Sequence, residues 1–327
     1  MKRIGAGVGL ALAAFAATHR LRLRDLSGAV AMVTGGSRGL GFAIAEELAA
    51  HGARVAICAR GEEALERARE RLGPGALATR CDVADPAQVD AWVAEVLDRH
   101  GRVDVLVNNA GIITVGPMRA QRREDFERAM DVMFFGVLNP TLAVLPAMRR
   151  QGGGTIANVT SIGGKVAVPH LGSYTPAKFA AVGLSQALRV ELSPEGIRVV
   201  TVVPWLLRTG SYRAAEFKGR RRLEYGLFAP LASAPLLTVG GRRAAARIVK
   251  AIRRGEAEVA VGAPAWLLSR ANGLAPATTA RAMTLAARVL PDGSAPQPVP
   301  GREIESPVDE TPLVTFGERA ARDLNQA

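Results

Sequence analysis

A regular alternation along residues 25–262 most constrains the fold. Short runs rich in β-branched and other apolar residues are each followed by a longer amphipathic stretch. Parallel strands need crossover connections, so this alternation predicts βαβ units and a parallel sheet. The predicted strands are 29–33, 54–58, 76–80, 103–107, 154–159, 197–203 and 258–261. Together they predict an α/β protein with one doubly wound parallel sheet of seven strands.

Helices are predicted between these strands. Helical spacing of apolar residues is clearest in 40–50, 62–71, 86–100, 123–150, 174–192 and 242–254. One helix has a favourable start, because Asp85 suits the N-cap and Pro86 suits the first helical position. The segment 205–239 breaks the pattern with Gly, Pro and a basic run at 220–222. We expect a mobile insertion over the ligand there.

Composition bounds the class of protein. The 327 residues are 48% hydrophobic and 22% charged, as in a globular protein with a large core. A formal charge of +12 attracts acidic partners. However, only five of the 42 basic residues are Lys and the arginines are scattered, which indicates a compositional bias towards Arg and not a binding surface. No nucleic-acid-binding motif appears, so we expect no nucleic-acid partner. Cys58 and Cys81 lie in apolar runs without metal-ligand spacing, which predicts reduced core residues and no metal site.

A glycine-rich loop follows the first predicted strand and opens a helix. Glycines there let the backbone approach a pyrophosphate, whose charge faces the helix N–H groups and the positive end of the helix dipole. A structural turn is the alternative, but the position between strand and helix favours a dinucleotide site. The predicted contacts are Gly35, Ser37, Arg38, Gly39, Leu40 and Gly41.

Charge near the adenosine ribose predicts the choice of cofactor. An acidic residue at the end of the second strand accepts from a free 2'-hydroxyl, whereas an arginine there pairs with a 2'-phosphate. Here that strand ends at Arg60, and Arg38 lies in the glycine loop. Although Arg60 could instead point only to solvent, the two arginines favour NADP(H) over NAD(H).

Four motifs in order resemble the short-chain dehydrogenase/reductase family. They are Thr34-Gly35-x-x-x-Gly39-x-Gly41, Asn108-Asn109-Ala110-Gly111 after the fourth strand, Ser161, and Tyr174-x-x-x-Lys178. The resemblance covers roughly residues 26–262. It implies one Rossmann-type, three-layer αβα domain that binds both cofactor and substrate, in homodimers or homotetramers.

The resemblance also implies roles for individual residues. The residue matching Asp82 contacts the adenine, and the Asn-Asn-Ala-Gly turn steadies the central sheet beside the cofactor. Beyond the glycine loop and Arg60, the implied cofactor contacts are Asp82, Val83, Asn109, Ala110, Gly111, Tyr174, Lys178, Pro204 and Thr209. The implied catalytic residues are Ser161, Tyr174 and Lys178.

Elementary chemistry supports the same catalytic residues. Tyr174 and Lys178 are four residues apart, so they lie one above the other on a helix face. An ammonium beside a phenol is expected to lower the pKa of Tyr174 towards neutrality, which makes it usable as an acid or base. Ser161, with Thr160 as the alternative, would donate to the carbonyl oxygen. Pro176 in the first turn predicts a helix that begins near Ser173 as the N-cap.

Two positions depart from the family pattern. The family usually places an asparagine in the long helix before the fifth strand, where it holds a water of the proton relay. Alignment on Phe134-Phe135-Gly136 puts Met133 at that position, and methionine cannot make those hydrogen bonds. After the sixth strand Pro204 and Thr209 match, but Trp205 replaces a glycine and is expected to narrow the nicotinamide pocket.

The N-terminal segment 1–24 differs from the domain that follows it. An uncharged apolar run, 4–17, lies between Met1-Lys2-Arg3 and a basic cluster. It is shorter than the roughly 20 residues that cross a bilayer, but it has the n- and h-regions of a secretory signal. Because NADP(H) is maintained inside cells, we expect a cytoplasmic protein whose residues 4–17 are retained and associate with a membrane. A plain extension is the nearest alternative.

The C-terminal extension, 263–327, changes character along its length. Residues 263–290 are apolar with spaced arginines, 291–307 are rich in Pro and Gly, and the rest are charged and mixed. Its apolar part has three possible roles that periodicity does not separate: to pack on the core, to cover the substrate site or to lie on a membrane.

Two functions compete. The favoured one is an NADP(H)-dependent oxidoreductase that interconverts a small apolar carbonyl compound and an alcohol by hydride transfer. The apolar character is suggested by Trp205, Leu206, Leu207, Tyr212, Phe217, Tyr225 and Phe228, although these could simply pack the covering loop against the core. The alternative is a weakly active or inactive nucleotide-binding or scaffold protein of the same fold. Met133 and Trp205 motivate it, and the intact Ser161, Tyr174 and Lys178 oppose it.

Overall fold

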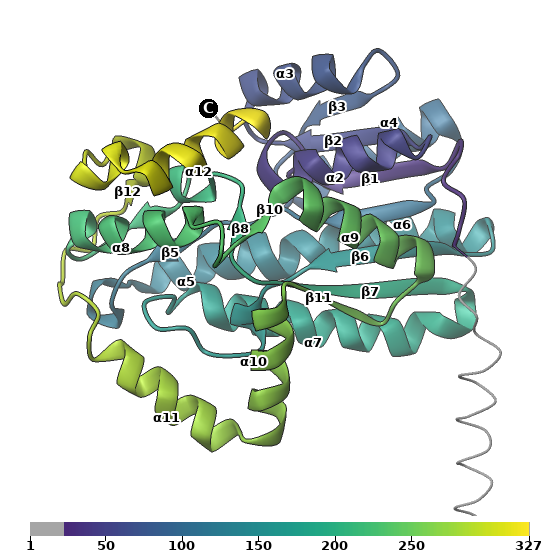
Figure 1. The fold of residues 1–327 in the computed structure, drawn as a ribbon. Coiled ribbons are helices and arrows are strands. Elements are labelled where there is room, and N and C mark those ends of the chain that lie inside the picture. The colour runs from purple at the N-terminus through teal and green to yellow at the C-terminus, as the bar shows by residue number, and fades with distance from the viewer. Residues whose placement is uncertain (1–22, 327) are drawn as a thin grey trace, which may run out of the picture.

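The central element of the structure is a parallel sheet of seven strands in the order β11-β7-β6-β4-β1-β2-β3 (Figure 1). The structure, a computed structural model, describes residues 23–326. The strands are β1 (Val30–Thr34), β2 (Arg54–Ala59), β3 (Leu77–Arg80), β4 (Val105–Asn108), β6 (Gly154–Val159), β7 (Ile197–Pro204) and β11 (Glu258–Val261). All seven predicted strands are confirmed, and the order reverses beside β1, as in a doubly wound sheet.

Helices cover both faces of the sheet and complete three layers. α2 (Gly39–Ala50), α3 (Glu62–Leu72) and α9 (Gly241–Arg254) pack on one face. α4 (Pro86–His100), α5 (Arg123–Met130), α6 (Gly136–Arg150) and α7 (Tyr174–Leu192) pack on the other. Alternate residues of β1 enter the two cores, since Ala31 joins the first and Met32 the second.

The predicted helix 123–150 is interrupted. A π-helical turn, Asp131–Phe135, separates α5 from α6. Pro140 has no N–H to donate to the carbonyl of Gly136, which weakens the regular ladder there. Taken together, α5, the π-helical turn and α6 form the one helical stretch of the described residues that is long and apolar enough to cross a membrane. Half of its most apolar window is buried in the protein. Its packing against α4 and α7 identifies it as a core helix.

Segment 205–239 contains more regular structure than the sequence predicts. It holds β8 (Leu207–Arg208), β9 (Glu216–Phe217), the start of β10 (Val239–Gly240) and the 13-residue helix α8 (Arg221–Ser233). Gly226 and Pro230 weigh against a helix by propensity. Packing overrides that preference, because Tyr225 and Ala229 on α8 are buried.

The extension beyond residue 262 forms two separate parts. α10 (Ala263–Leu274) and α11 (Pro276–Ala287) form a hairpin that projects from the body (Figure 1), with only Ala265 and Thr279 buried among their residues. β12 (Val299–Pro300) joins β9 and β5 (Thr114–Val115) in a small sheet. α12 (Pro312–Asp323) packs on α8. The predicted membrane-associating run, 4–17, lies outside the described residues.

Asp104, just before β4, is a buried polar anchor of the sheet and is 1% exposed. Its carboxylate accepts from the backbone N–H of Val30 at 3.0 Å and from Arg24 and Arg102, each at 2.7 Å. Burial raises the pKa of Asp104, but these hydrogen bonds and charges outweigh burial, so its pKa lies below 3.8. The carboxylate therefore joins the start of β1 to β4.

Asp104→Ala is expected to lower the free energy of unfolding by about 3 kcal/mol, because it removes a buried charge that satisfies two arginines and a backbone donor. Urea unfolding measures the change, and the exposed Asp90→Ala is the matched control. Because the folded-state pKa is depressed, the wild-type contribution is present above pH 3.8 and is lost as the pH falls further. Equal stability of the two variants would contradict this role.

Candidate functional site

The glycine loop between β1 and α2 has a shape that only glycine permits. Gly35 and Gly39 have φ of 62° and 59°, in the left-handed region. A Cβ on Gly41 would lie 2.2 Å from the carbonyl oxygen of Gly35, and one on Gly35 would lie 2.9 Å from the Cα of Ala110. No side chain caps the start of α2. The Gly39 N–H donates to the Leu324 carbonyl at 2.7 Å, so the N–H groups of Leu40 and Gly41 are the ones that suit an anion. The loop therefore fits a dinucleotide pyrophosphate.

Hydrogen bonds tie this loop to the end of β4. The Thr34 hydroxyl accepts from the backbone N–H groups of Asn109 and Ala110, at 2.9 and 3.1 Å. The Asn109 amide donates to the carbonyls of Thr34 and Gly35, at 3.1 and 3.2 Å. Asn108 is buried and donates to Asn158 in the neighbouring strand at 2.9 Å. The Asn-Asn-Ala-Gly turn thus steadies the sheet, as expected.

Two arginines predicted to select the cofactor lie close together. Burial lowers the pKa of Arg38, and the nearby charges of Arg302 and Arg60 lower it further. The Arg60 guanidinium is 3.8 Å from the carboxylate of Asp82, which also accepts from the Ala84 N–H at 3.1 Å. Arg60 therefore has a partner in the protein, and the sequence alone did not indicate the third arginine, Arg302.

Ser161, Tyr174 and Lys178 come together beyond the end of β6. Tyr174 opens α7, and a Cβ on Gly163 would lie 3.0 Å from the Cε1 of its ring and 3.5 Å from the Ser161 Oγ, so both side chains lie close to the same point. The Lys178 Nζ donates to the carbonyl of Val159 at 3.1 Å and lies 5.8 Å from the centroid of the Tyr174 ring. α7 begins after Ser173 as predicted, but the Ser173 side chain makes no capping hydrogen bond. Three residues from two elements therefore meet at one place.

The expected lowering of the Tyr174 pKa is wrong for this structure. Burial raises the pKa of Tyr174 above 10, and the nearby Ser161 hydroxyl offsets only part of the rise. Burial also lowers the pKa of Lys178 to about 8. The physical reason is that loss of hydration disfavours the phenolate and the ammonium alike, so burial is the dominant influence on both pKa values.

Met133 and Lys178 both approach Gly111. Met133 is 1% exposed, and both its Cγ and the Lys178 Nζ are within 3.9 Å of the place where a Cβ on Gly111 would stand. It occupies the middle of the π-helical turn, a local geometry found often at functional sites. Asn139 faces elsewhere, because its amide donates to the Val83 carbonyl at 3.0 Å. A buried methionine, which offers no side-chain hydrogen bond, therefore occupies the position where the family usually has an asparagine.

Pro204, Trp205 and Thr209 lie at or just after the end of β7. Pro204 ends β7, and Thr209 is 3% exposed. Thr209 packs beside Gly241, since a Cβ on Gly241 would lie 3.1 Å from the Thr209 methyl group. The Trp205 indole N–H donates to the carbonyl of Leu237 at 2.9 Å. This bond directs the ring towards the turn after α8.

Four of the seven residues whose apolar character suggested an apolar substrate pack against one another, which is the alternative given for them. Tyr212 and Phe217 are fully buried, and Tyr225 is 3% exposed. The Phe217 ring centroid lies 5.4 Å from that of Tyr225 and 5.8 Å from that of Phe228. These four residues form a separate hydrophobic core under α8, so their apolar character says nothing about the substrate.

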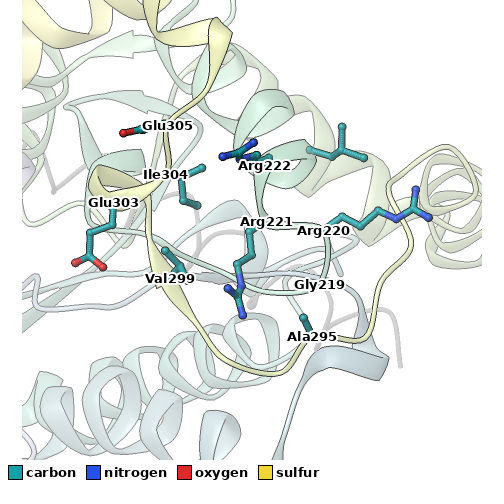
Figure 2. Close-up of a pocket in the computed structure, with 10 residues that line it drawn as sticks. Gly219, Arg220, Arg221, Arg222, Ala295, Val299, Glu303, Ile304 and Glu305 are labelled. Carbon is teal, nitrogen blue, oxygen red and sulfur yellow. The ribbon is translucent and has the colours of Figure 1, made fainter.

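A groove of about 650 Å³ lies between the start of α8 and the 295–305 segment (Figure 2). Arg220, Arg221 and Arg222 line it together with Glu303 and Glu305. None of its lining residues belongs to the predicted site. Among residues 23–326, no three His, Cys, Asp or Glu side chains are grouped so as to hold a metal ion.

Comparisons with known proteins identify the family. A family model described as short chain dehydrogenase matches residues 29–217. An uncharacterized oxidoreductase of Mycobacterium bovis is 39% identical over 191 residues, which are 58% of this chain and 77% of the relative. The chain belongs to the short-chain dehydrogenase family, and its oxidoreductase class follows.

Two solved structures show the same fold with different cofactors. A short-chain dehydrogenase from Burkholderia cenocepacia in complex with NADP has a TM-score of 0.67 and 29% identity, covering 80% of this chain and 99% of that one. A 3-ketoacyl-(acyl-carrier-protein) reductase from Brucella melitensis complexed with NADH has a TM-score of 0.63 and 30% identity, covering 72% and 96%. The Rossmann-type fold prediction is therefore confirmed, whereas the choice of cofactor depends on side chains.

Gly41→Ala is expected to weaken dinucleotide binding at least about tenfold, because the new methyl group would displace the loop carbonyl of Gly35. Isothermal titration with NADPH measures the affinity. Gly183→Ala is the control, since no atom lies within 4 Å of a Cβ at this helical position. Unchanged binding by a folded Gly41→Ala protein would contradict the assignment of the loop.

Proposed function

We propose that the protein is an NADP(H)-dependent oxidoreductase that interconverts a carbonyl and an alcohol on an apolar substrate. One observation carries the proposal. A hydroxyl, a phenol and an ammonium, from Ser161, Tyr174 and Lys178, meet beyond β6, and the glycine loop lies beyond β1 in the same parallel sheet. Ligands of such sheets bind outside the carboxyl ends of the strands. A dinucleotide on the glycine loop can therefore lie next to a substrate that contacts these three side chains.

Each catalytic side chain has a defined task in carbonyl reduction. The nicotinamide supplies the hydride when bound. Tyr174 transfers its hydroxyl proton to the substrate oxygen, and Ser161 donates a hydrogen bond to that oxygen as negative charge develops. With a pKa of about 8, Lys178 is mostly protonated at pH 7, so its charge stabilises the tyrosinate that forms. Alcohol oxidation reverses these steps.

Arg38 and Arg60 support NADP(H) as the cofactor. The end of β2 carries Arg60 where a carboxylate would select a free ribose hydroxyl. A phosphate gains charge-assisted hydrogen bonds from two guanidinium groups. Related structures contain either dinucleotide, so the proposal depends on these two residues of the chain itself.

Side-chain exposure supports the proposals on the substrate and on oligomer contacts. Trp205, Leu206 and Leu207 are half-buried after β7 and suit an apolar substrate. Phe179 and Val190 are exposed on α7, as a contact in a homodimer or homotetramer requires. We further propose a catalytic domain of residues 25–262, extensions 1–24 and 263–327, and a cytoplasmic location with 4–17 on a membrane surface.

A second candidate function is nucleotide binding with little turnover. Met133 favours it, because a buried methionine at this position, which like Lys178 approaches Gly111, offers no side-chain hydrogen bond to a water that could return protons to the lysine. Such a protein would bind dinucleotide and act as a sensor or scaffold.

Tyr174→Phe is expected to lower kcat for carbonyl reduction by about 10²–10⁴-fold and to leave the NADPH dissociation constant unchanged, because only the proton donor is removed. Stopped-flow oxidation of NADPH with a panel of apolar ketones and aldehydes measures the rate. Wild-type binding without turnover on any substrate would favour the second function. No binding of either dinucleotide would contradict both.

Arg60→Ala is expected to raise the NADPH dissociation constant about tenfold or more and to leave that of NADH nearly unchanged, since only NADPH carries the 2'-phosphate. Fluorescence titration with both dinucleotides measures the ratio. The exposed Arg99→Ala on α4 controls for the loss of one positive charge. Equal weakening of both cofactors would argue against Arg60 as a selector.

A further inference from the structure

The end of α12 docks on the glycine loop, nearly 290 residues away in the sequence. The backbone N–H of Gly39, the first residue of α2, donates to the carbonyl of Leu324 at 2.7 Å. The Asn325 side-chain amide donates to the carbonyl of Ser37 at 2.7 Å. These two bonds hold the backbone on either side of Arg38.

Asn325 also holds the helix that follows Arg60. Its amide nitrogen donates to the carbonyl of Ala64 in α3 at 2.8 Å, and its oxygen accepts from the Arg67 guanidinium at 3.1 Å. Both amide hydrogens and the amide oxygen are therefore engaged, and the residue is 6% exposed. One side chain bridges the segment that carries Arg38 and the helix that begins two residues after Arg60.

A helix-ending role alone does not explain these contacts. Asn325 has a φ of 58°, and the N–H of Gln326 donates to the carbonyl of Ala321 at 2.8 Å, so its backbone ends α12 in the left-handed manner. Glycine would serve that purpose equally well. The three side-chain hydrogen bonds are additional and all point to the two segments that flank the arginines.

α12 is itself firmly placed. Glu318 accepts from the hydroxyl of Tyr212 at 2.6 Å and pairs with Arg213. A Cβ on Gly210 would lie 2.3 Å from the Cβ of Ala321, so the helix and the 210–213 turn are in close contact. Asn325 therefore extends from a packed helix and has little freedom to leave the loop.

We propose that Asn325 is a positioning residue that fixes Arg38 and Arg60 relative to each other and so determines the preference for the 2'-phosphate. The inference rests on the proposed binding of NADP(H) at the glycine loop. Asn325 would not contact the phosphate. It acts through its hydrogen bonds to the Ser37 carbonyl and to α3. The neighbouring Leu324 carbonyl accepts from the Gly39 N–H, and the N–H groups of Leu40 and Gly41 stay available for the pyrophosphate.

The deciding variant is Asn325→Gly, which keeps the left-handed backbone and removes only the side-chain hydrogen bonds. We expect the NADPH dissociation constant to rise about tenfold, which corresponds to about 1.4 kcal/mol, and that of NADH to rise at most about threefold. Both are measured by fluorescence titration of the full chain. Arg319→Ala, at an exposed position of the same helix, is the control.

Asn325→Ser gives a second test if the glycine variant is poorly folded. Serine adds no charge, and its single hydroxyl hydrogen can satisfy at most one of the carbonyls of Ser37 and Ala64, so a change of the NADPH-to-NADH affinity ratio in the same direction is expected. An unchanged ratio in a folded variant overturns the inference, whether both affinities stay the same or fall together. Failure of the wild type to bind either dinucleotide instead overturns the proposed function.

Discussion

The rest of the site depends on the hydrogen-bonded contact between the ends of β1 and β4. Thr34 and Asn109 exchange side-chain and backbone hydrogen bonds across two neighbouring parallel strands. This exchange satisfies buried polar groups and fixes the first turn of the glycine loop against the Asn-Asn-Ala-Gly turn. The backbones of Gly35 and Ala110 approach too closely to admit even a methyl group between them. Any change that pushes these two turns apart would therefore break the hydrogen bonds and open the site.

Two asparagine side chains from different parts of the chain hold the glycine loop by hydrogen bonds. Asn109 comes from the central sheet and lies within the part of the chain that matches the family model. Asn325 comes from the extension and donates to the Ser37 carbonyl in the same loop. The extension also supplies Arg302 near Arg38. Residues outside the matched region therefore contribute to the electrostatics and shape of a site whose framework belongs to the family.

Sequence reasoning succeeded where a signal is local and failed where it is not. The seven strands follow from apolar runs, and the spacing of Tyr174 and Lys178 places both on one helix face. Helix α8 was missed because Gly226 and Pro230 oppose it and only tertiary packing reveals it. The Tyr174 pKa was predicted in the wrong direction, since burial cannot be read from a pair of residues. Asn325 and Arg302 gave no signal, because their partners lie hundreds of residues away.

The bond between Asn325 and Ser37 spans 288 positions of the sequence, which has a consequence for synthesis on the ribosome. The glycine loop and β1 emerge early, whereas the amide that braces the loop emerges only after every strand of the sheet has been made. A nascent chain can therefore form its Rossmann core while the loop still lacks its outer support. The proposed preference for the 2'-phosphate would therefore appear later in biogenesis than the sheet itself, once residue 325 has been made.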